Sequence, residues 1–220
     1  AGARGQATVW GSKVATTAAE AAFANGIAGH ALDFDDSLPS LRGHPSTTMG
    51  PAALAVGEAA NASGADVLAA FAMGLEIAGK IGRALGPQHY VRGWHTTATA
   101  GIFSSTTAAA RLWKLNAQQL QIAWGLAASQ CAGLVRNFGT MTKPLHAGHC
   151  SRNGLYAALM AKDGFTASHD AFEHAQGYFE LFNGAGNYHV EKILANWANP
   201  LDVLSPGIGL KQYPCCASTH

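Results

Sequence analysis

Charged side chains are scarce in this chain. Asp, Glu, Lys and Arg together make up 12% of its 220 residues, about half of the usual share of roughly 25%. The fourteen basic residues are scattered and the net charge is only +1, so the basic stripe of a nucleic-acid-binding protein is lacking. Low charge together with abundant Ala and Gly predicts helices that pack closely on several sides.

Long apolar runs are also lacking. The longest stretch without a charged residue, 115–135, contains several Asn, Gln and Ser side chains, whereas a membrane-spanning helix needs about 20 predominantly apolar residues. The N-terminus shows no basic segment followed by an apolar one, as a signal peptide would. We therefore expect no contact with a membrane.

The four cysteines form no recognisable framework. Cys131, Cys150 and the adjacent pair Cys215 and Cys216 have the spacing of neither a disulfide scaffold nor a zinc site, which indicates a reduced, cytoplasmic protein. The chain has no initiator Met and stops directly after a dense polar segment that contains two of these cysteines. We expect it to be a fragment, or to lack terminal segments.

The hydrophobic periodicity is mostly helical. Helices are expected around 23–34, over 51–62, 67–85, 97–113, 116–131, 144–160 and 168–182, and over 190–197. Asn116 and Gln119 form a predicted capping pair, and Ser168 is a predicted N-cap. Only 210–216 reads as a strand, and Pro214 would confine it to an edge. The predicted fold is a mainly α orthogonal helical bundle.

Two segments place a cationic or titratable side chain where an apolar helix begins: 92–97, with His95, and 141–149, with Lys143. Because Lys143 precedes a proline, its backbone is biased away from the α region and the helix should start at Pro144. A lysine at a helix N-terminus opposes the macrodipole. A bound anion would explain this position, since the free N–H groups and the ammonium would hold it together; a solvated loop lysine is the alternative.

A cluster of carboxylates precedes a histidine in the first quarter of the chain. Asp33 and Asp36 are expected to share one helical face at i, i+3, with Asp35 pointing elsewhere, and such proximity can raise the pKa of one carboxyl group. A solvated acidic helix end is the simpler interpretation. A helical terpene cyclase has a similar Asp motif but would need an aromatic-lined cavity, and only 9% of residues are aromatic.

Histidines offer the groups for proton transfer near neutral pH. His44 lies in a Gly-rich turn and His95 at a helix start, and neutral imidazole is well suited to act as a base, although a lone histidine is more often structural. His146 and His149 share a helical face at i, i+3, but no Asp or Glu accompanies them. We therefore expect no zinc site there.

Taken together, several of these segments resemble the MmgE/PrpD family, which includes 2-methylcitrate dehydratases, cis-aconitate decarboxylases and iminodisuccinate epimerases. The matching motifs follow one another in the family's order from about residue 18 to residue 220, and their residues are most similar to those of the epimerase branch. It rests on Ala-Leu-Asp-Phe-Asp-Asp-Ser (31–37), Gly-His-Pro-Ser (43–46), Arg-Gly-Trp-His (92–95), Met-Thr-Lys-Pro-Leu-His (141–146) and Lys-x-Tyr-Pro (211–214).

The resemblance implies a large helical domain followed by a smaller α+β lid domain, with the active site in the cleft between them. In this chain, residues 1–209 would be the helical domain and 210–220 the start of the lid, whose remainder is absent. It also implies a homodimer that needs no metal or organic cofactor. Carried over by position, the catalytic residues are Asp33, His44, His95, Lys143 and Lys211, with the predicted substrate-binding residue Ser37 at a neighbouring threonine position. The other predicted substrate-binding residues are Arg92, Thr142, Cys216 and His220, and Cys216 or His220 would also be the candidate for the second acid that an epimerase needs on the opposite face.

The expected function is that of a lyase or isomerase that forms or quenches a carbanion next to a carboxylate of a small di- or tricarboxylic acid. Lys143 and Lys211 would hold substrate carboxylates, His95 or His44 would move the α-proton, and Asp33 would orient that histidine. Cys216 stands where the decarboxylase branch has a histidine, which speaks against decarboxylation. A non-catalytic helical dimerisation or binding module is the alternative from another class.

Overall fold

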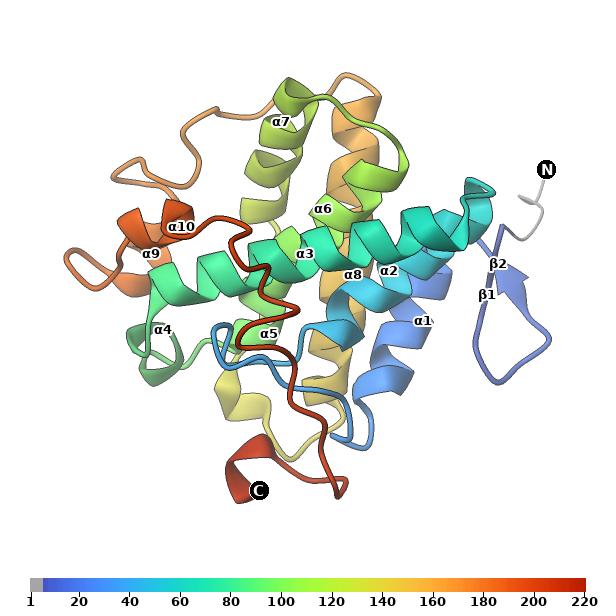
Figure 1. Cartoon of the computed structure of the whole chain (residues 1–220), viewed down its shortest axis with the longest axis horizontal. Coiled ribbons are helices and arrows are strands. Elements are labelled where there is room, and N and C mark those ends of the chain that lie inside the picture. The colour runs from blue at the N-terminus through green and yellow to red at the C-terminus, as the bar shows by residue number, and fades with distance from the viewer. Residues whose placement is uncertain (1–5) are drawn as a thin grey trace.

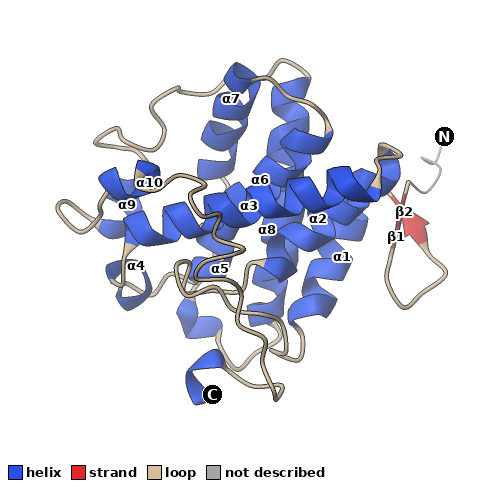
Figure 2. Ribbon diagram, viewed as in Figure 1, coloured by secondary structure: helices blue, strands red, loops and turns tan. Residues whose placement is uncertain are grey.

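The computed structural model describes residues 6–220, and helices dominate it (Figures 1 and 2). The predicted mainly α class is confirmed. The longer helices are α1 (Ala18–His30), α2 (Ser46–Ala59), α3 (Gly64–Leu85), α6 (Gly101–Leu112), α7 (Ala117–Ala128) and α8 (Thr142–Lys162). The short elements are α4 (Gln88–Val91), α5 (Thr96–Thr99), α9 (Tyr178–Asn183), α10 (Glu191–Leu194), the 3-10 turns Val135–Asn137 and Ala217–Thr219, and the antiparallel hairpin of β1 (Ala7–Thr8) and β2 (Ala15–Thr16).

The helices cross one another and do not run as a parallel stack. In Figure 1, α3 lies across the front of the molecule while α6, α7 and α8 run behind it in a different direction. The centre is filled by Phe103, Met49, Leu75 and Leu155, all buried, together with many alanines. Close packing of small residues, as the composition predicts, is what lets these helices approach.

Glycines mark the closest helix crossing. A Cβ added at Gly148 of α8 would lie 2.3 Å from the carbonyl oxygen of Phe23 in α1, which is closer than any side-chain carbon can come. Only glycine therefore allows α1 and α8 to pack at this distance. The crossing matters because the end of α1 and the start of α8 carry groups of the site described below.

Several predicted boundaries need correction. The helix expected from Pro144 begins at Thr142; Pro144 fits its first turn because the backbone N–H that proline lacks would have no helical partner there. The expected helix 97–113 is split at Ala100 into α5 and α6. The helix expected from 51 begins at Ser46, where the carboxylate of Asp36 accepts from the backbone N–H and the hydroxyl of Ser46.

The helix predicted from Ser168 is wrong. Residues 166–168 are irregular, residues 169–177 form turns and bends, and α9 begins only at Tyr178. Ser168 donates to the side chain of Asp170, and the turn closes on itself through a bond from the Tyr178 N–H to the Ala171 carbonyl. Phe172 reaches the core from this turn, 4.7 Å from Phe103 between ring centroids, so the helical spacing of the aromatics reflects packing and not a helix.

Two further elements are shorter or absent. The helix expected over 190–197 is limited to Glu191–Leu194, and residues 210–216 form no strand. The capping pair of Asn116 and Gln119, in contrast, forms the predicted capping box. Near the predicted strand the only pairing among the described residues is an isolated bridge between Ser37 and Gly209, so no neighbouring strand extends a ladder there.

The last part of the chain returns across the helices to the site. Residues 195–211, here called the C-terminal strap, cross in front of α3 in Figure 1. Buried Glu76 of α3 accepts from the N–H groups of Ala198 and Asp202, and Lys80 donates to the carbonyls of Ala195 and Asn196. A buried ion pair that also satisfies the backbone of an irregular segment fixes that segment firmly. The strap thereby delivers Lys211 to the site.

Candidate active site

A pocket of about 490 Å³ lies where the loop after α1, the segment 87–97, the start of α8 and the C-terminal turn meet. It is lined by Ser37, Leu38, Pro39, Arg42, Gly43, His44, Pro87, Tyr90, Val91, His95, Thr97, Phe138, Lys143, Cys216 and Ala217. Arg42 and Lys143 bring positive charge to this lining, and no carboxylate is among its members. A small anion is therefore the ligand that the pocket favours.

Asp33 lies beside the pocket and joins two lysines. Its carboxylate accepts from Lys143 and, at 2.8 Å, from Lys211, which also donates to the Asp33 carbonyl at 2.7 Å. Asp33 has φ 52°, a left-handed conformation that Asp and Asn tolerate better than most residues, and this turn directs the carboxylate at both ammonium groups. Burial alone would raise the pKa of Asp33, but the bonds from the lysines hold it below its usual range.

This contact explains why a lysine stands in the first turn of α8. The Asp33 carboxylate offsets the unfavourable interaction of Lys143 with the helix dipole. A bound ligand is therefore not needed to account for the position. Lys143 also lies 5.1 Å from the Phe138 ring centroid and lines the pocket, so its ammonium is available to an additional anion.

The other two carboxylates of the motif have separate partners, so the predicted pairing of Asp33 with Asp36 on one helical face is wrong. The segment leaves the helix after His30. Asp35 bonds the Nδ1 atom of His30 at 2.8 Å, and Asp36 bonds Ser46. Burial raises the pKa of Asp36, with a contribution from the neighbouring charge of Asp35.

Four histidines form a cluster at the pocket: His44 and His95 line it, and His30 and His146 pack against these two. The ring centroids of His30 and His44 are 5.0 Å apart, those of His30 and His95 are 5.7 Å apart, and those of His95 and His146 are 5.3 Å apart. His44 is held by a bond between its Nδ1 atom and the Asp36 carbonyl, and its Nε2 atom lies 3.7 Å from the Asp33 carboxylate.

Burial favours the neutral form of three of these histidines, His44, His95 and His146. Burial lowers the pKa values of His44 and His146, and it lowers that of His95 further, with the neighbouring histidines and Lys143 acting in the same direction. A neutral imidazole can accept a proton at pH 7. His95 lines the pocket and its Nδ1 atom is engaged by His146, so Nε2 is the ring nitrogen left for a ligand.

The structure brings together most of the residues that the sequence predicted for the site. Ser37, His44, His95, Lys143 and Cys216 line the pocket, and Asp33 and Lys211 lie next to it through the ion pairs.

Three predicted residues lie elsewhere. Arg92 packs near Gly184 after α9, and the Thr142 N–H is bonded to the Thr140 hydroxyl at the start of α8. His220 bonds the Cys215 sulfur at 3.2 Å and stacks on Tyr213. The described structure therefore does not bring these three side chains into the pocket lining.

Other residues of the site were missed by sequence reasoning. Arg42, Tyr90 and Phe138 line the pocket, and His30 with Asp35 forms a buried pair behind it. Arg42 directly precedes the family motif Gly-His-Pro-Ser (43–46). This neighbouring position is the sequence signal that could have pointed to it. The buried His30 was hidden by its place in an apolar helical pattern.

One group among the described residues has the geometry of a metal site. The ligand atoms of His30, Asp33 and His44 all lie within 4.8 Å of one another. Asp33 already accepts from two ammonium groups, and these positive charges would repel a divalent cation. His146 and His149 face different partners, His95 and Asn153, so the pair at i, i+3 does not converge on one point.

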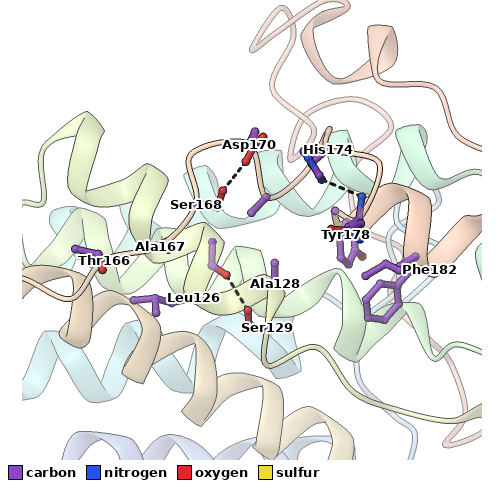
Figure 3. A pocket seen from close by; sticks show the side chains of 15 residues that line it. Leu126, Ala128, Ser129, Thr166, Ala167, Ser168, Asp170, His174, Tyr178 and Phe182 are labelled. Atoms are coloured by element: carbon purple, nitrogen blue, oxygen red, sulfur yellow. Dashed lines mark hydrogen bonds between the residues drawn. The ribbon is translucent and has the colours of Figure 1, made fainter.

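A second pocket, of about 530 Å³, lies between the end of α7 and residues 166–182 (Figure 3). It is slightly larger, but its titratable side chains are few. Asp170 is bonded to Ser168, and His174 accepts from the Gln176 N–H. Because no group of cations or bases converges on it, the chemistry points to the pocket beside Asp33.

A comparison with known families shows where the chain belongs. Residues 1–191 match the model of the MmgE/PrpD N-terminal domain. The chain belongs to the MmgE/PrpD family. This membership confirms the resemblance that the motifs indicated, and the helical architecture is consistent with that N-terminal domain.

Among curated proteins, the chain is 29% identical to human cis-aconitate decarboxylase over 221 residues, covering 97% of this chain and 45% of the relative. It is also 29% identical to the cis-aconitate decarboxylase of Aspergillus terreus over 223 residues, covering 96% and 45%. The chain thus spans just under half the length of these relatives. No helix in the described part of the chain is long and apolar enough to cross a membrane.

Proposed function

We propose that the complete protein is a lyase or isomerase that forms or quenches a carbanion α to a carboxylate of a small di- or tricarboxylic acid, without a cofactor. The observation that carries the proposal is the pocket lining, which contains Lys143, Arg42 and the buried His95 but no carboxylate. Burial lowers the pKa of His95 and so favours its neutral form. The names of the relatives, cis-aconitate decarboxylases, support a small carboxylic acid as substrate.

The charges near the pocket suit an anionic intermediate. Asp33 lies between Lys143 and Lys211, and Lys211 has a second carboxylate, Asp35, at 3.9 Å. Arg42 makes none of the ion pairs found among residues 6–220, so it and the pocket-lining ammonium of Lys143 are the cations that would meet a substrate carboxylate. Removal of an α-proton moves negative charge onto the carboxylate as an enediolate. Fixed cations stabilise that charge more than the ground state, particularly where water is excluded.

We assign the proton transfer to His95. Its Nε2 atom would accept the α-proton, and the C–H bonding pair would pass into the enediolate held by Lys143. His44, whose Nε2 atom faces Asp33, would act on the other side of the substrate. Its Nδ1–H is donated to the Asp36 carbonyl, so a neutral His44 offers Nε2 only as a second acceptor. The proton taken up by a leaving hydroxyl in a dehydratase would come from the imidazolium formed at His95, and in an epimerase the thiol of Cys216 would return a proton to carbon on the other face. Lys211 would keep Asp33 in place and add positive charge.

Cys216 bears on the choice between these reactions. It lines the pocket at the position where the resemblance to the decarboxylase branch implies a histidine. A thiol has a reference pKa of about 8.5 against about 6.5 for histidine, and it lacks a second nitrogen through which it could be oriented. We therefore expect dehydration or epimerisation, and little decarboxylation of cis-aconitate. Rapid release of itaconate from cis-aconitate by the unaltered protein would overturn this choice of branch.

A substrate screen tests the proposal. The complete protein would be incubated in deuterated water with di- and tricarboxylic acids, and deuterium at the α-carbon would be followed by NMR. Dehydration, epimerisation and decarboxylation all give a signal in this assay. Absence of exchange with every acid would favour the alternative, a non-catalytic helical dimerisation or binding module. A homodimer and a cytoplasmic location are further parts of the proposal, which gel filtration and cell fractionation would test.

A further inference from the structure

The contact between His95 and His146 has a consequence for the protonation of His95. Their Nδ1 atoms face each other at 3.1 Å, and both side chains are buried. A neutral imidazole carries one N–H, so one of these two Nδ1 atoms must donate and the other must accept. The direction of this bond decides which nitrogen of His95 has a free lone pair.

We infer that His146 is a positioning residue that accepts the Nδ1–H of His95 and so keeps the Nε2 lone pair of His95 free for the substrate. The inference rests on the proposed function, since only a base at His95 requires this tautomer. In the opposite arrangement Nε2 would carry the proton and could not accept another. A hydrogen bond to one imidazole nitrogen selects the state of the other.

The surroundings of His95 hold its ring in place. His30 stacks on it with planes 22° apart, and Phe138 meets it edge-on at 4.7 Å between centroids. The ring is therefore not free to turn and exchange its two nitrogens. His146 comes from α8, one turn after Lys143, so one helix carries both the cation for the substrate and the partner of the base.

An uncharged acceptor suits a base that must be neutral at rest. A carboxylate beside the Nδ1–H of His95 would stabilise the protonated ring, whereas imidazole accepts the bond without adding negative charge. Among the described residues, the imidazole ring of His146 makes its only hydrogen bond to His95. Nothing else in that part of the structure requires its polar atom, which favours a role toward His95.

Two substitutions at His146 separate positioning from packing. His146→Leu keeps bulk and removes the acceptor, and His146→Asn places an amide oxygen near the position of Nδ1. The matched control is His149→Leu on the same helix, because His149 is half-buried and bonds only Asn153. Thermal unfolding of each variant of the complete protein shows whether it is folded.

We expect His146→Leu to lower kcat for α-proton exchange about tenfold or more, as loss of a hydrogen bond to a reacting group does, with KM within about twofold of the original. His146→Asn should recover part of the loss, and His149→Leu should keep the original kcat. With ¹⁵N-labelled histidine, NMR should place the His95 proton on Nδ1 in the original protein. The His95→Gln variant assigns that signal.

An unchanged kcat in folded His146→Leu, or a His95 proton on Nε2 in the original protein, would overturn the inference. Failure of the proposed function looks different, because the original protein would then exchange no α-proton of any acid tested. The NMR measurement still decides in that case whether His146 sets the tautomer of His95.

Discussion

Replacing Asp33 with Asn should destabilise the protein through charge alone. Asn has nearly the same shape and tolerates the left-handed backbone at this position, φ 52°. The substitution removes the charge that holds Lys143 and Lys211 on one carboxylate. Lys143 would then lose its one ion pair among residues 6–220, and Lys211 would keep only the longer pair with Asp35 at 3.9 Å.

The magnitude follows from the burial of the pair. The Asp33 side chain is 21% exposed, whereas that of Lys211 is 2% exposed. Breaking a fully buried ion pair costs about 3–5 kcal/mol and breaking a surface pair about 0–1 kcal/mol. We expect Asp33→Asn to lower the free energy of unfolding by about 2–3 kcal/mol at pH 7, as measured by urea unfolding of the complete protein.

The pH dependence gives a second readout. Because the pKa of folded Asp33 lies below its usual range, its stabilisation is fully present above the unfolded value of about 3.9 and is lost as the pH falls through the folded value. The difference between the original protein and Asp33→Asn should shrink by about 1 kcal/mol from pH 7 to pH 3.

Asp36→Asn is the matched control for this experiment. Among residues 6–220 the Asp36 carboxylate bonds only Ser46, and burial raises its pKa, so its charge costs stability above that pKa and the cost is relieved as the pH falls. Its substitution should change the free energy of unfolding less than Asp33→Asn does at pH 7. Equal effects of the two substitutions, or a loss below about 0.5 kcal/mol for Asp33→Asn, would refute the account of the ion pairs.

Three further predictions concern activity and stability. Lys143→Ala should keep the protein folded, since Asp33 retains Lys211, but lower α-proton exchange by about 100-fold or more; a normal turnover in the folded variant would make Lys143 structural. EDTA should leave exchange unchanged, because two ammonium groups occupy Asp33 in the group that it forms with His30 and His44; loss of activity that one added metal restores would contradict this. Burial lowers the pKa of His89 to about 4, so the neutral ring contributes its full stabilisation above a pH of about 6.5, and the free energy of unfolding falls by about 2 kcal/mol as the pH is lowered to about 5. Urea unfolding at a pH of about 7 and of about 5 should show a smaller loss of stability for His89→Gln than for the original protein. An equal loss would count against the buried neutral ring.

Site residues that stand next to a recognisable local feature could be predicted from the sequence, whereas contacts between segments far apart in the chain could not. His95 and Lys143 could be singled out because each stands near a helix start, and the family motifs named Asp33, His44 and Lys211. The ion pair between Lys211 and Asp33 spans 178 positions. It depends on the buried Glu76 and Lys80 that fix the C-terminal strap, which no local pattern reveals.

The errors have local physical causes. The boundary at Pro144 failed because a proline fits the first turn of a helix as well as its first residue. The helix from Ser168 failed because the Asp170 side chain competes for the serine hydroxyl, while Phe172 reaches the core from a turn. The sequence pairs His146 only with His149, because the contact of His146 with His95 depends on how α8 packs. The division at residue 209 into a helical domain and a lid stays a prediction.

The most direct test of the central claim compares two substitutions on the best acid from the deuterium screen. The complete protein, His95→Gln and His149→Gln would be followed side by side for deuterium at the α-carbon, with thermal unfolding as the check of folding. The account predicts exchange by the original protein and by His149→Gln, and a loss of about 100-fold or more in His95→Gln. Exchange at the original rate by folded His95→Gln would contradict it.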